Sequence, residues 1–276
     1  MLGEKQTEVI HKETDRPAVS LLIPFYNEEK QIETTLQTVV PIMDSLNLSY
    51  EIVCVDDGSS DNSWRLLSQY ADEYPQVYAL RLSRNFGKEA ALSAGLAEVR
   101  GDAAITIDGD LQHDPRHIPQ MVELWQEGYD VVEGIKSARN DGALSRFAAN
   151  TFYKLFKFAS GYNLKNASDY KLLDRKVIDA WNRLPEKETF YRALSAWLGF
   201  RRITFEFEVQ ERKSGKSKWS VFKLMRLGSN ALTAFSSKPL QIINIVGWIF
   251  IFFFLILTVQ TSVNYFQGHA VEGFTT

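Results

Sequence analysis

The sequence has little cysteine, no apolar stretch near its N-terminus and little net charge, and each of these absences excludes something. The one cysteine, Cys54, lies in the apolar run Ile52 to Val55, which predicts a buried strand thiol and fits a reducing compartment. The polar tail 1–17 lacks the apolar core of a secretory signal peptide. A formal net charge of -3 provides no general attraction to nucleic acid, so we expect no nucleic-acid partner.

Several common catalytic motifs are also missing. Gly58-Ser59-Ser60 lacks the lysine and the full spacing of a phosphate-binding P-loop, and no Gly-x-Ser-x-Gly elbow occurs. His113 and His117 are four residues apart, but Pro115 lies between them and no further soft ligands follow. The sequence therefore disfavours a P-loop, an α/β-hydrolase nucleophile and a zinc site.

One long apolar run is present near the C-terminus. Pro239 to Val259 carries no charge and is long enough, at about 21 residues, to cross a hydrocarbon core as a helix. Basic residues precede this run and none follows it, which predicts a cytoplasmic N-terminal side: Lys213, Lys216, Lys218, Lys223, Arg226 and Lys238. Apolar residues alternate with basic and small polar ones in 220–237, as in a helix lying on a membrane surface.

The first half of the chain alternates strand and helix patterns. We predict strands at Val19–Phe25, Glu51–Val55, Val77–Leu82 and Ala103–Ile107, with helices between them and a later strand at Arg202–Glu208. A further helical pattern covers about 145–160. Such alternation predicts an α/β fold with a mostly parallel sheet, whose ligand sites lie at the carboxyl ends of the strands.

The stretch Asp108-Gly109-Asp110 follows the fourth predicted strand directly. Residues i and i+2 of an extended chain point to the same side, and the glycine lets the backbone bend, so the two carboxylates can approach each other. Hard oxygen ligands at this spacing suit Mg²⁺ or Mn²⁺ carrying a substrate's phosphates. Taken alone, the same residues also fit an acidic turn after a strand.

Seven ordered motifs extend this interpretation: Ile23–Glu28, Val55–Asp61, Arg84–Lys88, Asp108–Gln112, Ser168–Arg175, Phe190–Arg192 and Arg212–Trp219. The first four resemble family 2 glycosyltransferases, which have the GT-A fold. The last three look like the polyprenyl-phosphate branch of that family, which includes dolichol-phosphate mannose synthase and the bacterial undecaprenyl-phosphate glucosyltransferases. The resemblance covers about Val19 to Val259.

The resemblance implies a set of donor-site residues. The nucleoside would be held by Pro24, Tyr26, Glu28, Val55 and Asp57. A planar base can pack on the tyrosine ring while the carboxylates accept hydrogen bonds. The metal and diphosphate would be held by Asp108, Asp110 and Gln112. Where related enzymes often have an arginine past the position of Gly134, this chain has Lys136 and then Arg139, and either could face the phosphates.

The acceptor side can be argued from chemistry. A polyprenyl phosphate has a second pKa near 6, so its oxygen is largely anionic at pH 7 and cationic positioning should matter more than a strong base. We expect Arg192, Arg212, Ser217 and Lys218 to hold that phosphate. A basic patch that contacts anionic lipid is the alternative for the lysine-rich run. Asp169 occupies the position of the family's catalytic carboxylate.

These expectations combine into a membrane-anchored, metal-dependent and inverting enzyme. It would transfer a sugar from a nucleotide donor to undecaprenyl or dolichyl phosphate at the cytoplasmic face of the bilayer. UDP-glucose is slightly favoured over UDP-N-acetylhexosamine and GDP-mannose. A processive polysaccharide synthase and a non-catalytic scaffold are the alternatives, and a homo-oligomer is left open. The predicted units are a tail (1–17), a GT-A catalytic domain (18–219), an interfacial helix (220–237), a transmembrane helix (238–260) and an extracytoplasmic or truncated end (261–276).

Overall fold

The computed structural model describes residues 8–9, 16–136, 168–184, 191, 198–207 and 238–267. Its strands are β1 (Glu8–Val9), β2 (Val19–Phe25), β3 (Tyr50–Asp56), β4 (Val77–Arg81), β5 (Ala103–Thr106), β6 (Val131–Lys136), β7 (Lys171–Asp174) and β8 (Arg202–Phe207). Its helices are α1 (Ile32–Ser45), α2 (Ser63–Glu73), α3 (Lys88–Glu98), the 3₁₀ turn η1 (Pro115–His117), α4 (Ile118–Gln126), α6 (Arg175–Asn182) and α9 (Lys238–Phe266).

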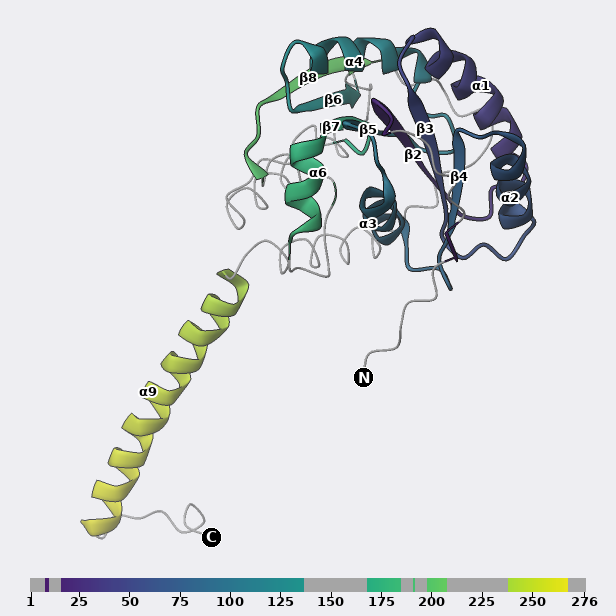
Figure 1. The fold of residues 1–276 in the computed structure, drawn as a ribbon. Coiled ribbons are helices and arrows are strands. Elements are labelled where there is room, and N and C mark those ends of the chain that lie inside the picture. The colour runs from purple at the N-terminus through teal and green to yellow at the C-terminus, as the bar shows by residue number, and fades with distance from the viewer. Residues whose placement is uncertain are drawn as a thin grey trace, which may run out of the picture.

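These strands form one mixed sheet in the order β1-β4-β3-β2-β5-β7-β6-β8 (Figure 1). The predicted strands are all present, and each begins and ends within one residue of its expected bounds. β1, β6 and β7 were not predicted. β7 has only four residues and begins with a lysine, so it is too short to show an alternating pattern. It runs antiparallel to both β5 and β6, so the sheet is mostly but not wholly parallel.

The chain reverses its direction of travel across the sheet at β2. β3 and β4 are added in turn on one side of β2, whereas β5 pairs with β2 on the other side, and all these pairs are parallel. Such a reversal leaves a crevice at the carboxyl ends of the two strands that flank it, and ligands of open α/β sheets bind there. The loops that follow β2 and β5 carry Tyr26 and Asp108, two of the residues singled out in the sequence.

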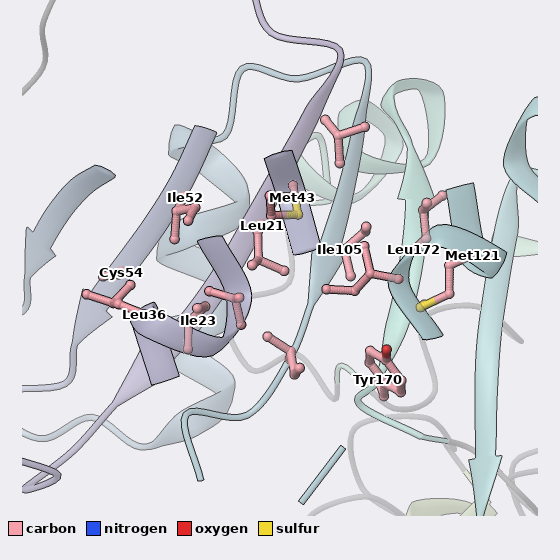
Figure 2. Packing of buried hydrophobic residues seen from close by; sticks show 14 of the residues in the cluster. Leu21, Ile23, Leu36, Met43, Ile52, Cys54, Ile105, Met121, Tyr170 and Leu172 are labelled. Carbon is pink, nitrogen blue, oxygen red and sulfur yellow. The ribbon is translucent and has the colours of Figure 1, made fainter. Parts of the chain in front are cut away.

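Helices cover both faces of the sheet and make two cores (Figure 1). Leu21, Ile23 and Ile52 pack with α1, α2 and α4 on one face, where Figure 2 shows Met43 beside Leu21, and Met121 beside Leu172. Leu22 and Val53 alternate with them and pack with α3 and α6 on the other face. Because both faces are buried, the strands read as continuous apolar runs, which is how the sequence revealed them.

The C-terminal helix α9 is apolar on every side. Its segment Ile243–Phe266 has a mean hydropathy of 2.3, and none of it is buried against the rest of the described chain. The segment is therefore long and apolar enough to cross a membrane. The helix continues past residue 260, where we expected the span to end, to Phe266. Thr258 and Ser262 donate hydrogen bonds back to carbonyl oxygens four residues earlier, so their hydroxyls do not interrupt it. The predicted helices at 145–160 and 220–237 lie outside the described residues.

Candidate active site

The loops after β2 and β3 are joined by hydrogen bonds between backbone and side chains. The Asn27 N–H donates to Ser59 Oγ at 2.9 Å, and the Ser60 N–H donates back to Asn27 Oδ1 at 2.8 Å. Asn27 adopts a left-handed conformation (φ 54°), which asparagine tolerates better than most residues. The loop therefore has a fixed shape, and it leaves the Tyr26 ring 46% exposed beside the crevice.

Asp57 is buried and holds the next loop in place. Its Oδ1 accepts a hydrogen bond from the Phe86 N–H at 2.8 Å, and its Oδ2 accepts one from the Gly87 N–H at 2.9 Å. Burial raises the pKa of Asp57, although these two donors act in the opposite direction. Val55 lies in the core against α3, so its side chain packs rather than lining the crevice, whereas Pro24 is partly exposed.

The Asp108-Gly109-Asp110 loop follows β5 and is pressed against the sheet. A Cβ atom at Gly109 would lie 2.6 Å from Phe25 Cε1, so only glycine lets the backbone approach the ring this closely. Thr35 of α1 donates its hydroxyl hydrogen to the Gly109 carbonyl at 2.7 Å. These contacts fix the backbone between the two carboxylates, and Asp108 stays partly exposed while Asp110 is exposed.

Asp110 and Glu28 bring negative charge to the same place from the loops after β5 and β2. Asp110 accepts hydrogen bonds from the Gln112 backbone N–H, at 3.1 Å, and from the Gln112 side-chain amide. Burial raises the pKa of Glu28, and the nearby charges of Asp110 and Asp61 raise it further. The crevice thus concentrates carboxylates, a distribution that favours a cation.

Lys88 connects the two carboxylates for which the sequence predicts the central roles. Its Nζ lies 2.6 Å from Asp108 Oδ1 and 2.8 Å from Asp169 Oδ2. The charges of Asp108 and Asp169 raise the pKa of Lys88 although burial opposes them, so the ammonium form persists. The structure therefore brings Asp108 and Asp169 together, although they are 61 positions apart in the sequence.

Asp169 is 6% exposed and contacts a buried network of polar side chains. Thr106 Oγ1 donates to the Asp169 carbonyl at 2.5 Å and lies 2.8 Å from the Tyr191 hydroxyl. Burial raises the pKa of Tyr191 well above its ordinary value, which keeps that hydroxyl neutral. Lys171, also fully buried, pairs with Glu133 at 3.0 Å and lies 4.8 Å from the centre of the Tyr191 ring.

The acidic loop suits an open metal site more than a closed one. Within the described ranges, no three His, Cys, Asp or Glu side chains are grouped as a complete ligand set. Mg²⁺ and Mn²⁺ often bind through one or two carboxylates and take their remaining ligands from water and substrate phosphates. Asp108 and Asp110 supply hard oxygen ligands of this kind in an accessible loop, so the residues present fit such an ion.

The two histidines pack among aromatic rings. His113 is 4% exposed and stacks on Tyr170 with 5.2 Å between ring centroids, and His117 lies 5.5 Å from the ring of Phe205. His113 Nδ1 is also 3.8 Å from Asp108 Oδ2. Both histidines therefore help to pack the β8 side of the crevice.

The predicted acceptor residues lie outside the described part of the chain: Arg192, Arg212, Ser217 and Lys218. Arg139, the predicted alternative to Lys136 at the donor phosphates, also lies outside it. Lys136 is the last residue of β6 and pairs in register with Phe207 of β8, which places its backbone at the carboxyl end of that strand. Their assigned roles stay predictions.

Sequence reasoning missed the residues that join these parts, namely Lys88, Thr106, Tyr191 and the Glu133–Lys171 pair. A signal existed for Lys88, because it is the first residue of α3 and a cation is unfavourable at a helix N-terminus unless it has a specific partner. Lys171 likewise stands in a strand between apolar neighbours, where a charge requires a buried partner. Thr106 gave no such signal, since threonine is common in strands.

A doubly wound sheet that gathers carboxylates where the strand order reverses is typical of an α/β enzyme that binds its ligand, together with a cation, at the carboxyl ends of the strands. The comparison with known families agrees with this class. The model of glycosyl transferase family 2 matches residues 20–181, and the chain belongs to that family. It is therefore a glycosyltransferase.

Two relatives and two solved structures show the range of similarity. An uncharacterized glycosyltransferase of Synechocystis is 37% identical over 231 residues (83% of this chain, 73% of that protein). The bactoprenol glucosyl transferase of Shigella phage SfV is 37% identical over 231 residues (83% and 75%).

Among structures, glucosyl-3-phosphoglycerate synthase of Mycobacterium tuberculosis with Mg²⁺ and UDP has a TM-score of 0.55 at 20% identity (78% of this chain, 75% of that one). A mannosyltransferase of Pyrobaculum calidifontis with GDP-Man and Mn²⁺ has 0.53 at 19% (81% and 64%). These structures confirm the predicted GT-A fold, and the curated relatives confirm the resemblance drawn from the motifs.

Proposed function

We propose that this enzyme transfers one hexose from a nucleoside diphosphate sugar to a polyprenyl phosphate, with glucose from UDP-glucose as the favoured donor. The observation that carries the proposal is the meeting of Asp108 and Asp169 at Lys88, at the point where the strand order reverses. The names of relatives at 37% identity, bactoprenol glucosyl transferases, support both the sugar and the lipid acceptor.

On the donor side, residues from the loops after β2, β3 and β5 would bind different parts of the nucleotide sugar. The exposed Tyr26 ring offers a face on which a base can pack, and the Glu28 carboxylate can accept hydrogen bonds from the nucleoside. Asp57 fixes the loop at Phe86 and Gly87, and so shapes the nucleoside pocket through the backbone. Pro24 and Val55 contribute packing and backbone beneath it.

Asp108 and Asp110, with Gln112 beside them, are the residues that would hold Mg²⁺ or Mn²⁺. A bound divalent cation neutralises charge on the departing nucleoside diphosphate. The solved structures with Mn²⁺ or Mg²⁺ in the same fold support this choice of ions. Lys136, at the end of β6, would add a further positive charge toward the diphosphate.

On the acceptor side, we assign Asp169 the role of orienting the reacting groups. The acceptor phosphate is already largely ionised at pH 7, so its oxygen can attack the sugar carbon without first losing a proton to a strong base. Asp169 is held by Lys88 through its side chain and by Thr106 through its backbone. We assign Arg192, Arg212, Ser217 and Lys218 to binding the acceptor phosphate, and attack from the face opposite the leaving group inverts the sugar carbon.

A lipid acceptor would also explain why the chain has a helix long enough to span a membrane. A polyprenyl chain lies in the bilayer with its phosphate at the surface, so the enzyme needs its crevice close to that surface. α9 supplies an anchor of sufficient length, and the excess of basic residues before it favours a cytoplasmic catalytic domain. The segment 220–237 would lie along the interface.

Label transfer into lipid tests the proposal. The full chain in detergent is given undecaprenyl phosphate, Mg²⁺ or Mn²⁺ and each labelled nucleotide sugar in turn, and label extracted into organic solvent is counted. We expect transfer from UDP-glucose above all, its loss with EDTA, and no extractable label without the lipid. If no donor yields a lipid product, the proposal fails; if another donor does so better, only the choice of sugar is wrong.

A further inference from the structure

Lys88 occupies a position that is unfavourable unless something compensates for it. It is the first residue of α3, where the helix dipole concentrates positive charge, and Gly87 precedes it without a side chain to cap the helix. Its side chain is 38% exposed at the crevice. The cation is therefore retained at this position by its two carboxylate partners and not by the helix.

The two partners belong to different parts of the site. Asp108 begins the loop after β5, and Asp169 precedes β7, the antiparallel neighbour of β5. Both carboxylates lie under 3 Å from the same nitrogen, so without it they would face each other as like charges. Asp169 is almost fully buried, which makes an uncompensated negative charge there costly.

We propose that Lys88 is a positioning residue that acts as a built-in counter-ion, holding Asp108 and Asp169 together and competing with the divalent cation for Asp108. This inference rests on the proposed metal site. A cation that binds Asp108 must share that carboxylate with the ammonium or displace it, and it meets the repulsion of a nearby positive charge. Metal binding alone is then weak, whereas a nucleoside diphosphate offers Lys88 another anionic partner and removes part of the competition.

A purely structural role predicts a different response. If Lys88 served only to hold the fold, its loss would loosen the site and weaken metal binding along with stability. If it is a competing counter-ion, its loss lowers stability in the absence of metal but strengthens metal binding. The two effects then have opposite signs, which separates the alternatives.

The test compares Mn²⁺ dissociation constants of the full chain in detergent, measured from the electron paramagnetic resonance signal of free Mn²⁺. Lys88→Met should bind Mn²⁺ about tenfold more tightly than the wild type, as expected for removing a charge from a partly exposed site. It should also melt at a lower temperature in EDTA and regain more of that loss when Mn²⁺ is added. Lys88→Gln serves if the methionine variant does not fold.

Two controls fix the interpretation. Lys88→Arg keeps the charge and should leave the Mn²⁺ affinity within about twofold of the wild type. Lys176→Met removes a lysine of α6 that lies away from the crevice and is 2.6 Å from Asp130. This variant should also leave the Mn²⁺ affinity unchanged. Unchanged or weaker Mn²⁺ binding by the charge-removing variants, Lys88→Met and Lys88→Gln, overturns the inference alone. If Asp108→Asn binds Mn²⁺ as tightly as the wild type does, the proposed metal site is overturned as well.

Discussion

At the scale of single residues, Asp169 depends on its neighbours for its position. Lys88 contacts one carboxylate oxygen and Thr106 holds the carbonyl of the same residue, so the side chain has little freedom. A carboxylate restrained in this way can orient an acceptor or a cationic side chain without itself taking a proton.

Asp169→Asn tests this role. The amide has the same shape but lacks the charge, so we expect turnover to fall about 100-fold or more, while binding of the nucleotide is preserved. Initial rates and nucleotide titrations measure the two effects separately. Asp102→Asn, at an exposed aspartate paired with Arg16, is the matched control and should keep full activity. Equal activity of the Asp169 variant would remove the residue from the mechanism.

Glu28 gives a pH-dependent prediction. Burial and the charges of Asp110 and Asp61 raise the pKa of Glu28, so the folded state binds its proton more tightly than the unfolded state does. The ionised side chain therefore destabilises the fold above its folded pKa, and this effect is relieved as the pH falls through that pKa toward the ordinary value of about 4.3.

Glu28→Gln should thus melt at a higher temperature than the wild type at pH 7, and the difference should disappear near pH 4. Thermal unfolding in detergent at the two pH values measures it. The same variant should bind the nucleotide more weakly, because it loses a carboxylate acceptor. Glu33→Gln, on the exposed side of the first turn of α1, is the control: it should not melt at a higher temperature than the wild type at pH 7, because a carboxylate there is favourable, and it should bind the nucleotide as the wild type does. A Glu28 variant less stable than the wild type at pH 7 would contradict the assignment.

At the scale of elements, the position of the acidic loop depends on its contact with β2. Gly109→Ala would place a Cβ atom 2.6 Å from Phe25 Cε1, and ring and loop would have to separate. Overpacking of this kind costs about 1–3 kcal/mol, and it would move the backbone between the two carboxylates. We expect a lower melting temperature and weaker Mn²⁺ binding.

Phe25→Leu in the Gly109→Ala background offers the alanine more room and should restore part of both losses. Thermal unfolding and Mn²⁺ titration of the single and double variants form a cycle that measures the coupling. If the two substitutions are simply additive, the close approach does not position the loop.

The elements themselves were largely predictable from the sequence, whereas the contacts between them were not. β2 to β5 are buried on both faces, so their apolar runs were visible, and turn residues marked their ends. β7 was missed because it is short and contains a buried charge. The meeting of Asp108 and Asp169 depends on the antiparallel pairing of β5 with β7, a long-range feature that no local pattern encodes. The partners of Lys88 come from two distant segments, so its position at the start of α3 could show that it needs a partner but not which residues supply it.

At the scale of the whole molecule, the account predicts which side of the membrane each part occupies. The single cysteine, Cys54, is buried in β3, and burial raises the pKa of its thiol to about 12, so it should not react with maleimide in the folded chain. Introduced cysteines can therefore report accessibility against a low background. Asn264→Cys lies near the end of α9, and Glu73→Cys lies on the exposed side of α2.

In intact cells, a membrane-impermeant maleimide should label Asn264→Cys, whereas Glu73→Cys should be labelled only after the cells are permeabilised. The unsubstituted chain is the control for background reaction at Cys54. The reverse pattern would place the catalytic domain outside the cytoplasm, and labelling of both positions in intact cells would mean that the orientation is mixed.

The central claim is that the crevice joins one sugar to one lipid phosphate with release of a nucleoside diphosphate. Its most direct measurement is the ratio of products formed by the full chain from UDP-glucose and undecaprenyl phosphate, with lipid and nucleotide products identified by mass spectrometry. We predict one UDP for each lipid that gains a single hexose, and about 100-fold less of both products from Asp169→Asn in the same time. Release of UMP, free glucose without a lipid product, or a chain of several hexoses on the lipid would contradict the account.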